Sequence, residues 1–196
     1  MTSPSQGAAA RMLFRKFLRS AIFSCFVVIS ANALLPAQQT GWPAYNGGPD
    51  GDHYSTLKQI TRANVHRLQQ AWQFDTGEKG GLQANPLIVG RTLYAYTPTE
   101  KIIALDAATG QLKWKFDSGI VVTQPARGLT YWAGDESNVT PPRIFAGVLN
   151  FLYCLDANTG KPVASFGENG RIDLRKNLGR DFEQQSIVLT TPGILY

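Results

Sequence analysis

Cysteine and histidine are scarce in this sequence of 196 residues, which contains two of each. His53 and His66 do not lie at metal-ligand spacing from each other or from Cys154, so the pattern gives no support to a zinc site. Cys154 lies in the apolar run Phe151–Leu155, where a small buried apolar residue is expected. Since Cys25 falls in the predicted leader described next, no internal disulfide is expected in the mature chain.

A hydrophobic run long enough to span a bilayer is also missing. The run Ala21–Ile29 is short, follows the basic stretch Arg11–Arg19 and precedes small residues at 31–33 and 35–37. This order is typical of a secretory signal peptide. Residues 1–37 are therefore predicted to be a signal peptide that directs residues 38–196 to the periplasm. An uncleaved membrane anchor, and so a membrane association, is the alternative.

An excess of one charge is absent outside that leader. The whole chain has a net charge of +5, but residues 1–37 hold four basic and no acidic side chains, which leaves 15 basic and 14 acidic ones. A polyanion partner is not implied, and no nucleic-acid binding is predicted. The hydrophobic content of 43% and the charged content of 17% are those of a globular domain.

Strand signals are frequent from Pro86 onward, at intervals of about eight to ten residues. Apolar and β-branched residues cluster at Pro86–Val89, Thr92–Thr97, Lys101–Leu105 and Lys113–Phe116, with turn residues between them. This pattern predicts four consecutive antiparallel strands and no helix.

The preceding residues carry two weaker signals. Thr61 is a plausible cap for a short helix over Ala63–Leu68. The segment Leu68–Phe74 alternates apolar and polar side chains after Ala71, which predicts a further strand.

A turn motif occurs twice, at Asp106–Gly110 and fifty residues later at Asp156–Gly160. In each copy the aspartate can accept hydrogen bonds from the N–H groups of the turn, and the glycine supplies a positive φ. A four-stranded unit repeated at about fifty residues predicts the blades of a β-propeller, with an ordinary β-sandwich as the alternative. Trp114 follows the first turn and is expected to wedge between blades, whereas the second copy has Ala164 there.

The combination Ala104-x-Asp106-x-x-Thr109-Gly110-x-x-x-Trp114 resembles the tryptophan-docking repeat of dehydrogenases that depend on pyrroloquinoline quinone (PQQ). The resemblance covers residues 41–196 and is greatest to the membrane-linked glucose or quinate type. Cytochrome-linked members carry two adjacent cysteines where this chain has Val121-Val122. Other similar stretches, in the same order, are 42–54, 60–72, 82–86, 127–132 and 166–170.

The resemblance implies an all-β fold, namely a β-propeller of eight blades. This chain would supply the first two to three of these blades. It also implies that Arg127, in the motif Arg127-Gly128-x-x-Tyr131-Trp132, binds PQQ. Gln83 matches a polar residue that contacts the cofactor, and Thr190 matches a threonine beside it, with Thr191 as the alternative register. No catalytic residue and no metal ligand are predicted within the chain. The calcium ligands and the general-base aspartate are expected beyond residue 196.

The function implied is that of the N-terminal part of a periplasmic PQQ-dependent dehydrogenase. Such an enzyme oxidises a hydroxyl of a sugar, polyol or alcohol to a carbonyl and passes electrons to a membrane quinone or a cytochrome. The chain alone is expected to be unstable or to aggregate, because an incomplete propeller exposes sheet edges. It is also expected neither to bind PQQ tightly nor to turn over substrate. The alternative is a non-catalytic propeller of the kind that supports outer-membrane protein assembly.

Overall fold

The computed structural model describes residues 41–48, 51–122, 124–135, 137, 139–179 and 187–195, all within the compact unit Thr40–Tyr196. The predicted signal peptide at 1–37 lies outside the described residues. Among those described, no helix is both long and apolar enough to cross a bilayer.

The first sheet contains the four strands that the sequence predicts. They are β1 (Leu87–Val89), β2 (Thr92–Tyr96), β3 (Ile102–Asp106) and β4 (Leu112–Phe116), and each pairs antiparallel with the next. Successive strands are neighbours because the turns between them are short.

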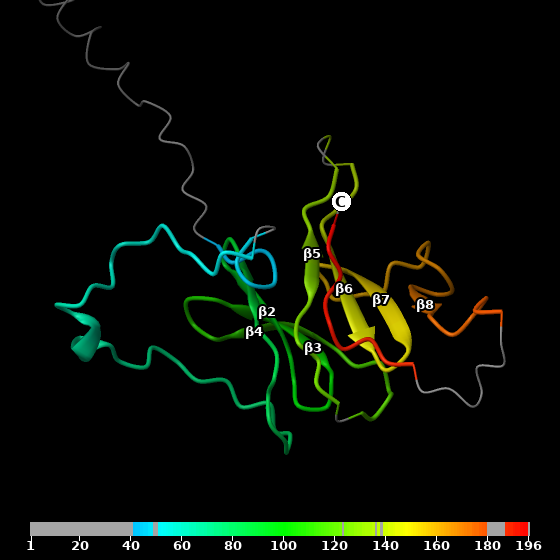
Figure 1. Cartoon of the computed structure of the whole chain (residues 1–196), viewed down its shortest axis with the longest axis horizontal. Helices are drawn as coiled ribbons and strands as arrows, with labels where there is room; N and C mark the ends of the chain where they lie inside the picture. The colour runs from blue at the N-terminus through cyan, green and yellow to red at the C-terminus, as the bar shows by residue number, and fades with distance from the viewer. Residues whose placement is uncertain are drawn as a thin grey trace, which may run out of the picture. The chain divides into compact units, whose positions relative to one another are not determined.

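The second sheet repeats this arrangement beside the first (Figure 1). Its strands are β5 (Thr130–Trp132), β6 (Arg143–Val148), β7 (Phe151–Asp156) and β8 (Arg171–Asp173), again antiparallel and in sequence order. Two four-stranded antiparallel sheets in succession are two propeller blades, so the all-β expectation is confirmed.

Both copies of the turn motif fold alike. The Asp106 carboxylate accepts the N–H of Ala108 and of Thr109, each at 3.1 Å. Asp156 accepts the N–H groups of Asn158 and Thr159, each at 2.9 Å. The glycines that close the two turns have φ values of 74° and 70°, as predicted. The repeat of about fifty residues is therefore a structural repeat.

The fourth strand of the second sheet begins later than in the first. Pro162 makes a single bridge with Leu155, after which the chain turns outward and returns as β8. The Val163 N–H still donates to the Cys154 carbonyl at 2.9 Å, so the chain leaves β7 only after this bond. Gly170 then accepts the N–H of Cys154 at 2.9 Å and restores the pairing.

The predicted helix over 63–68 is wrong in extent and in its cap. Only one 3₁₀ turn forms, η1 (Val65–Arg67). Asn64, rather than Thr61, is the residue before it, and its side chain accepts the Thr61 N–H at 2.7 Å. The sequence here offers no buried apolar stripe, so no packing extends the turn into a helix.

The predicted strand at 68–74 is also wrong, because this segment makes no strand pairing with the described residues. Its alternation has another cause. Trp72 is half-buried against the first turn motif, where its Nε1–H donates to the Ala107 carbonyl at 3.1 Å. A Cβ on Gly110 would lie 2.6 Å from the Trp72 ring, so the indole sits directly on the glycine.

Trp114 makes the same contact one repeat later and joins the two sheets. Its Nε1–H donates to the Ala157 carbonyl at 2.9 Å, and a Cβ on Gly160 would lie 2.5 Å from its ring. The hydroxyls of Tyr94 and Tyr96 also reach the second sheet, donating to Ala157 at 3.2 Å and to Gly147 at 2.9 Å. The predicted wedge between blades is confirmed.

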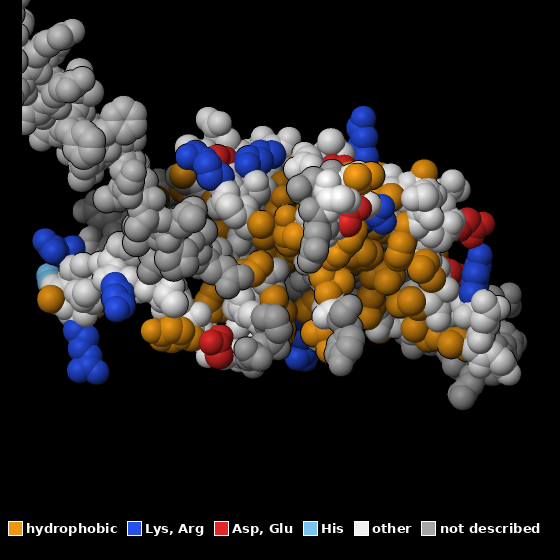
Figure 2. All heavy atoms as spheres, turned by 90° about the horizontal axis from the view of Figure 1, so that it is seen from above, with side chains coloured by type: hydrophobic (Ala, Val, Ile, Leu, Met, Phe, Trp, Pro, Cys, Tyr) orange, Lys and Arg blue, Asp and Glu red, His pale blue; other side chains and the backbone are white. Residues whose placement is uncertain are grey.

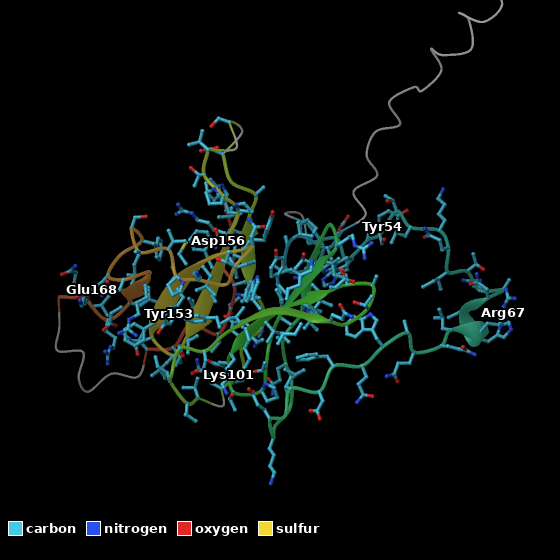
Figure 3. All side chains as sticks on the ribbon, turned by 180° about the vertical axis from the view of Figure 1, so that it is seen from behind. Tyr54, Arg67, Lys101, Tyr153, Asp156 and Glu168 are labelled. Atoms are coloured by element: carbon cyan, nitrogen blue, oxygen red, sulfur yellow. The ribbon has the colours of Figure 1, made fainter. Side chains whose placement is uncertain are left out.

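A long arm at residues 51–74 loops out from the sheets and returns to the first one at Trp72, with Arg67 near its outer end (Figures 1 and 3). Exposed apolar side chains lie along it, at Tyr54, Leu57, Ile60, Val65 and Leu68. Apolar side chains also gather over the middle of the face shown in Figure 2.

Glu78 fastens the segment that follows the arm to the first sheet. Its carboxylate accepts the Thr99 N–H at 3.0 Å and the Thr99 hydroxyl at 2.7 Å, and it lies 3.3 Å from Lys101 Nζ. Burial raises the pKa of Glu78, but the hydrogen bonds from Thr97, Thr99 and Lys101 outweigh this and lower the pKa to about 2. The ionised carboxylate therefore stabilises the fold.

We expect Glu78→Gln to lower the free energy of unfolding, most strongly above the usual glutamate pKa of about 4.5. Because the folded-state pKa is depressed, this contribution is present above pH 4.5 and is lost as the pH falls toward 2. Urea unfolding at several pH values measures it. The exposed Glu168→Gln is the matched control, and an equal effect of both variants would contradict the role of Glu78.

Candidate functional site

The three predicted cofactor residues lie on three adjacent segments. The Asn85 N–H donates to the Arg127 carbonyl at 2.9 Å, and the Arg127 N–H donates to the Thr190 carbonyl at 2.9 Å. Gln83 lies two residues before Asn85. The fold therefore brings together the main chains of positions that are far apart in the sequence.

Gly128 lies next to Arg127 at the point where these segments meet. It forms a parallel bridge with Asn85. A Cβ at Gly128 would lie 3.0 Å from the Tyr45 ring, and 3.5 Å from both the Asn85 carbonyl oxygen and the Pro192 ring. The Tyr45 ring would have to shift by a few tenths of an ångström to admit a Cβ, whereas the contacts with Asn85 and Pro192 would be ordinary van der Waals contacts. The glycine therefore lets Tyr45 pack closely against the Arg127-Gly128 pair.

Arg127 itself is exposed. Its guanidinium takes part in none of the ion pairs found among the described residues. A planar, permanently charged group with five donors suits a carboxylate or a quinone oxygen.

A polar cavity of about 190 Å³ lies beside these segments. Its walls are residues 80–84, 96–98, 100 and 124–126, so they include Gln83. This volume is more than ten times what a single bound water needs, about 10–15 Å³. The cavity is large enough for part of an organic ligand.

Glu100 and Gln124 contribute unpaired polar atoms to the wall of this polar cavity. Three buried atoms lack a hydrogen-bond partner: the two carboxylate oxygens of Glu100 and the Nε2 of Gln124. Burial raises the pKa of Glu100 to about 7, while the nearby Leu149 N–H and Gln124 amide lower it. These two donors do not reach hydrogen-bond geometry with the carboxylate.

A second, apolar cavity of about 310 Å³ has Gly128 in its wall, and Arg127 itself lines neither cavity. Residues 191–195 line it together with Gly128 and side chains of β6 and β7. The Leu189 N–H donates to the Leu149 carbonyl at 2.9 Å, which holds this segment against the second sheet. Thr190 thus lies on a segment that borders the apolar cavity, and Thr191, the alternative register, lines it.

PQQ is a planar quinone with three carboxylates, so its site needs cations and hydrogen-bond donors. The residues around Arg127 offer groups of both kinds. Arg127 offers an unpaired cation, and Gln83 and Gln124 offer amide N–H groups at the polar cavity. The apolar cavity beside them could receive a flat ring system. The described residues contain no group of three or more His, Cys, Asp or Glu side chains that could hold a metal ion.

The sequence analysis missed Glu100, Gln124 and Trp72. Nothing local marks Glu100 or Gln124, because their importance depends on burial by distant segments. Trp72 carried a usable signal, since it precedes the first turn motif as Trp114 precedes the second.

The predicted burial of Cys154 is confirmed: it is fully buried, and burial raises the pKa of its thiol.

Residues 42–196 match the protein family described as the β-propeller domain of glucose, ethanol and alcohol dehydrogenases that use PQQ. The chain is 32% identical to the quinoprotein glucose dehydrogenase of Escherichia coli over 76% of its length, and 30% identical to the quinate/shikimate dehydrogenase (quinone) of Acinetobacter baylyi over 79%. These alignments cover 21% and 22% of the two relatives, so the chain spans about a fifth of their length.

A solved structure agrees with these matches. The quinohemoprotein alcohol dehydrogenase of Pseudomonas putida HK5 superposes with a TM-score of 0.65 at 27% identity, covering 81% of this chain and 22% of that one. Sheet order, repeat and sequence all lead to the same assignment. The chain belongs to the PQQ-type β-propeller family of glucose and alcohol dehydrogenases.

Proposed function

We propose that the chain forms the first part of the propeller of a PQQ-dependent dehydrogenase and supplies one wall of its cofactor site. The observation that supports this most directly is the main-chain pairing of Arg127 with Asn85 and Thr190, which gathers the predicted cofactor residues beside two cavities. The alternative of a non-catalytic scaffold has less support, because the named relatives are dehydrogenases.

Each residue has a proposed role at this wall. The Arg127 guanidinium pairs with a carboxylate or quinone oxygen of the cofactor, because a charge-assisted hydrogen bond is stronger than a neutral one. Gln83 donates a neutral hydrogen bond, and Thr190 positions its segment against Arg127 through its carbonyl. When bound, PQQ supplies the electron acceptor for the oxidation of a hydroxyl to a carbonyl.

The remaining parts of the function are also proposals. The substrate is a sugar, polyol or alcohol, and the electrons pass to a membrane quinone or a cytochrome. Export by the predicted signal peptide places the protein in the periplasm. We do not assign the calcium ion to residues of this chain, since its described part contains no suitable ligand group.

Substitution of Arg127 tests the proposed wall. We expect Arg127→Ala to weaken the binding of PQQ to the chain by about 10- to 100-fold, since hydrogen bonds to charged groups contribute about 1.5–3 kcal/mol. NMR titration of the ¹⁵N-labelled chain with PQQ measures the affinity. Arg127→Lys retains the charge but not the planar fork, and we expect an intermediate loss.

Arg91→Ala is the matched control, because Arg91 lies on the turn between β1 and β2 and pairs with Asp106. Equal PQQ affinities for wild type and Arg127→Ala would contradict the assignment.

We also propose that these 196 residues alone do not turn over substrate, because no general base is assigned within them. Incubation with PQQ, calcium and an alcohol or sugar should give no dye reduction above the protein-free background. Dye reduction that depends on the chain would contradict this proposal.

A further inference from the structure

The segment that carries Trp72 repeats the sequence of β4 and the turn after it. Trp72-Gln73-Phe74-Asp75-Thr76-Gly77 is followed forty-two residues later by Trp114-Lys115-Phe116-Asp117-Ser118-Gly119. Four of the six positions are identical, and the fifth position carries a hydroxyl in both stretches. The chain therefore contains a second copy of the end of a blade, and this copy precedes the first sheet.

The two stretches also fold alike. In each, the N–H of the glycine donates to the aspartate two residues before it, at 2.8 Å in the first stretch and 2.9 Å in the second. The next N–H donates to the hydroxyl side chain at 3.2 Å in both. The two glycines have φ values of 70° and 74°. Since each tryptophan docks on the glycine of a turn motif, residues 70–74 correspond to β4 in sequence, local structure and docking.

Residues 70–74, which we call the open edge, differ from β4 in having no neighbouring strand. They make no backbone hydrogen bond to the part of the chain that the structure describes. The Trp72 carbonyl accepts only the Gln70 side chain, at 3.4 Å. Trp72 and Phe74 are half-buried and Gln73 is exposed, as at the matching positions of β4. In the described structure this alternation serves only the docking of Trp72, and the ladder groups of the backbone are left over.

The pairing of β4 shows what a partner of the open edge must offer. Opposite Trp114 lies Ala104, whose small side chain leaves room for the indole, and opposite Phe116 lies Ile102. Both residues of β3 are fully buried. An unpaired strand edge is a template for a further strand, and the side chains of that strand decide which partner fits. The open edge therefore suits a strand with a small residue opposite Trp72 and a β-branched apolar residue opposite Phe74.

We propose that the open edge is the fourth strand of a further blade and binds, in antiparallel register, a strand with the side-chain pattern of β3. The partner strand belongs to the same propeller, because the chain spans about a fifth of its relatives and matches their propeller domain. Pairing satisfies the free backbone groups of the open edge and holds Trp72 on the first turn motif. The wall of the polar cavity at 80–84 follows soon after, so the same pairing anchors that wall.

Hydrogen exchange tests whether the open edge accepts a strand. The probe is a synthetic hairpin that copies β2 and β3, residues 91–106, and it is added to the ¹⁵N-labelled chain. Without the hairpin, we expect the amides of the open edge to exchange rapidly and the amides of β4 that pair with β3 to be protected. With the hairpin at ten times the Kd found by NMR titration, the paired amides of the open edge should exchange about tenfold more slowly.

A disulfide cross-link tests the register and captures even weak binding. Since Ile103 lies opposite Lys115 in the first sheet, the hairpin residue equivalent to Ile103 should lie opposite Gln73. The hairpin carries Ile103→Cys, and the chain carries Gln73→Cys in a Cys25→Ser background. Gln69→Cys is the matched control, because Gln69 is also an exposed glutamine. In a glutathione redox buffer we expect roughly tenfold more cross-linked product at Gln73, since four residues along a strand are about 13 Å, too far for a disulfide.

Protection of the open edge together with preferred cross-linking at Gln73 would support the inference. Amides of the open edge that are already protected in the free chain would overturn it, because the edge would then have a partner. Equal cross-linking at Gln73 and Gln69, or none at either, would also overturn it. Hairpin-induced shifts confined to β4 would do the same. These outcomes do not depend on PQQ, so the inference and the proposed function can fail separately.

Discussion

Trp114→Ala is expected to cost about 3–5 kcal/mol of the free energy of unfolding, the usual range for removing a buried large aromatic side chain. The indole is 8% exposed, packs against the Tyr94 ring at a centroid distance of 5.9 Å and reaches the second sheet at Ala157. Its removal leaves a cavity between the sheets and deletes a hydrogen bond that joins them. Urea unfolding followed by far-UV circular dichroism measures the loss.

Trp114→Phe separates the two contributions of the indole. The smaller ring retains much of the packing but cannot donate to the Ala157 carbonyl. We expect a loss of about 1 kcal/mol from the missing hydrogen bond, plus a small packing term. If Trp114→Ala lost less than this conservative variant, the indole would not be the contact that joins the blades.

Gly160→Ala is expected to have the second large effect, from two separate causes. At a φ of 70° a Cβ costs about 1–2 kcal/mol in the backbone alone. The same Cβ would lie 2.5 Å from the Trp114 ring, so the indole must move away from the turn. The total loss in the free energy of unfolding should therefore exceed the backbone term.

Gly90→Ala is the matched control for Gly160→Ala. Gly90 also has a positive φ, 56°, but a Cβ there would meet no atom within 4 Å. The difference between the two variants isolates the contact with the indole. In the Trp114→Ala background this difference should disappear, because the ring that clashes is gone. Equal losses for both variants in the wild-type background would contradict the docking of Trp114 on Gly160.

The strands and turns of the sheets could be predicted from sequence because their causes are local. The Asp106 and Asp156 turns form bonds within three residues of the aspartate, and apolar residues at strand spacing specify the pairing that follows. The late start of the fourth strand of the second sheet was not predicted, because the chain leaves β7 after Val163 and returns at Gly170 only in the folded structure. The strand predicted at 68–74 failed because its alternation reflects the docking of Trp72, not a ladder.

The candidate site was predictable only as a set of positions. The family motif supplied Arg127, Gln83 and Thr190, but no sequence pattern showed that their segments are hydrogen bonded to one another. The polar cavity was not foreseen, because Glu100 and Gln124 acquire their unpaired, buried state from segments folded around them.

The sequence by itself determined the repeated blade, its turns and its family, since these depend on local hydrogen bonds and on apolar periodicity. Only the tertiary structure decided which turn each tryptophan docks on, Trp72 at a separation of 35 residues and Trp114 at 43. It also decided that Glu100 is enclosed without a counter-charge. Burial and pairing of this kind depend on how distant segments pack, and the free energy of a charge depends on that packing.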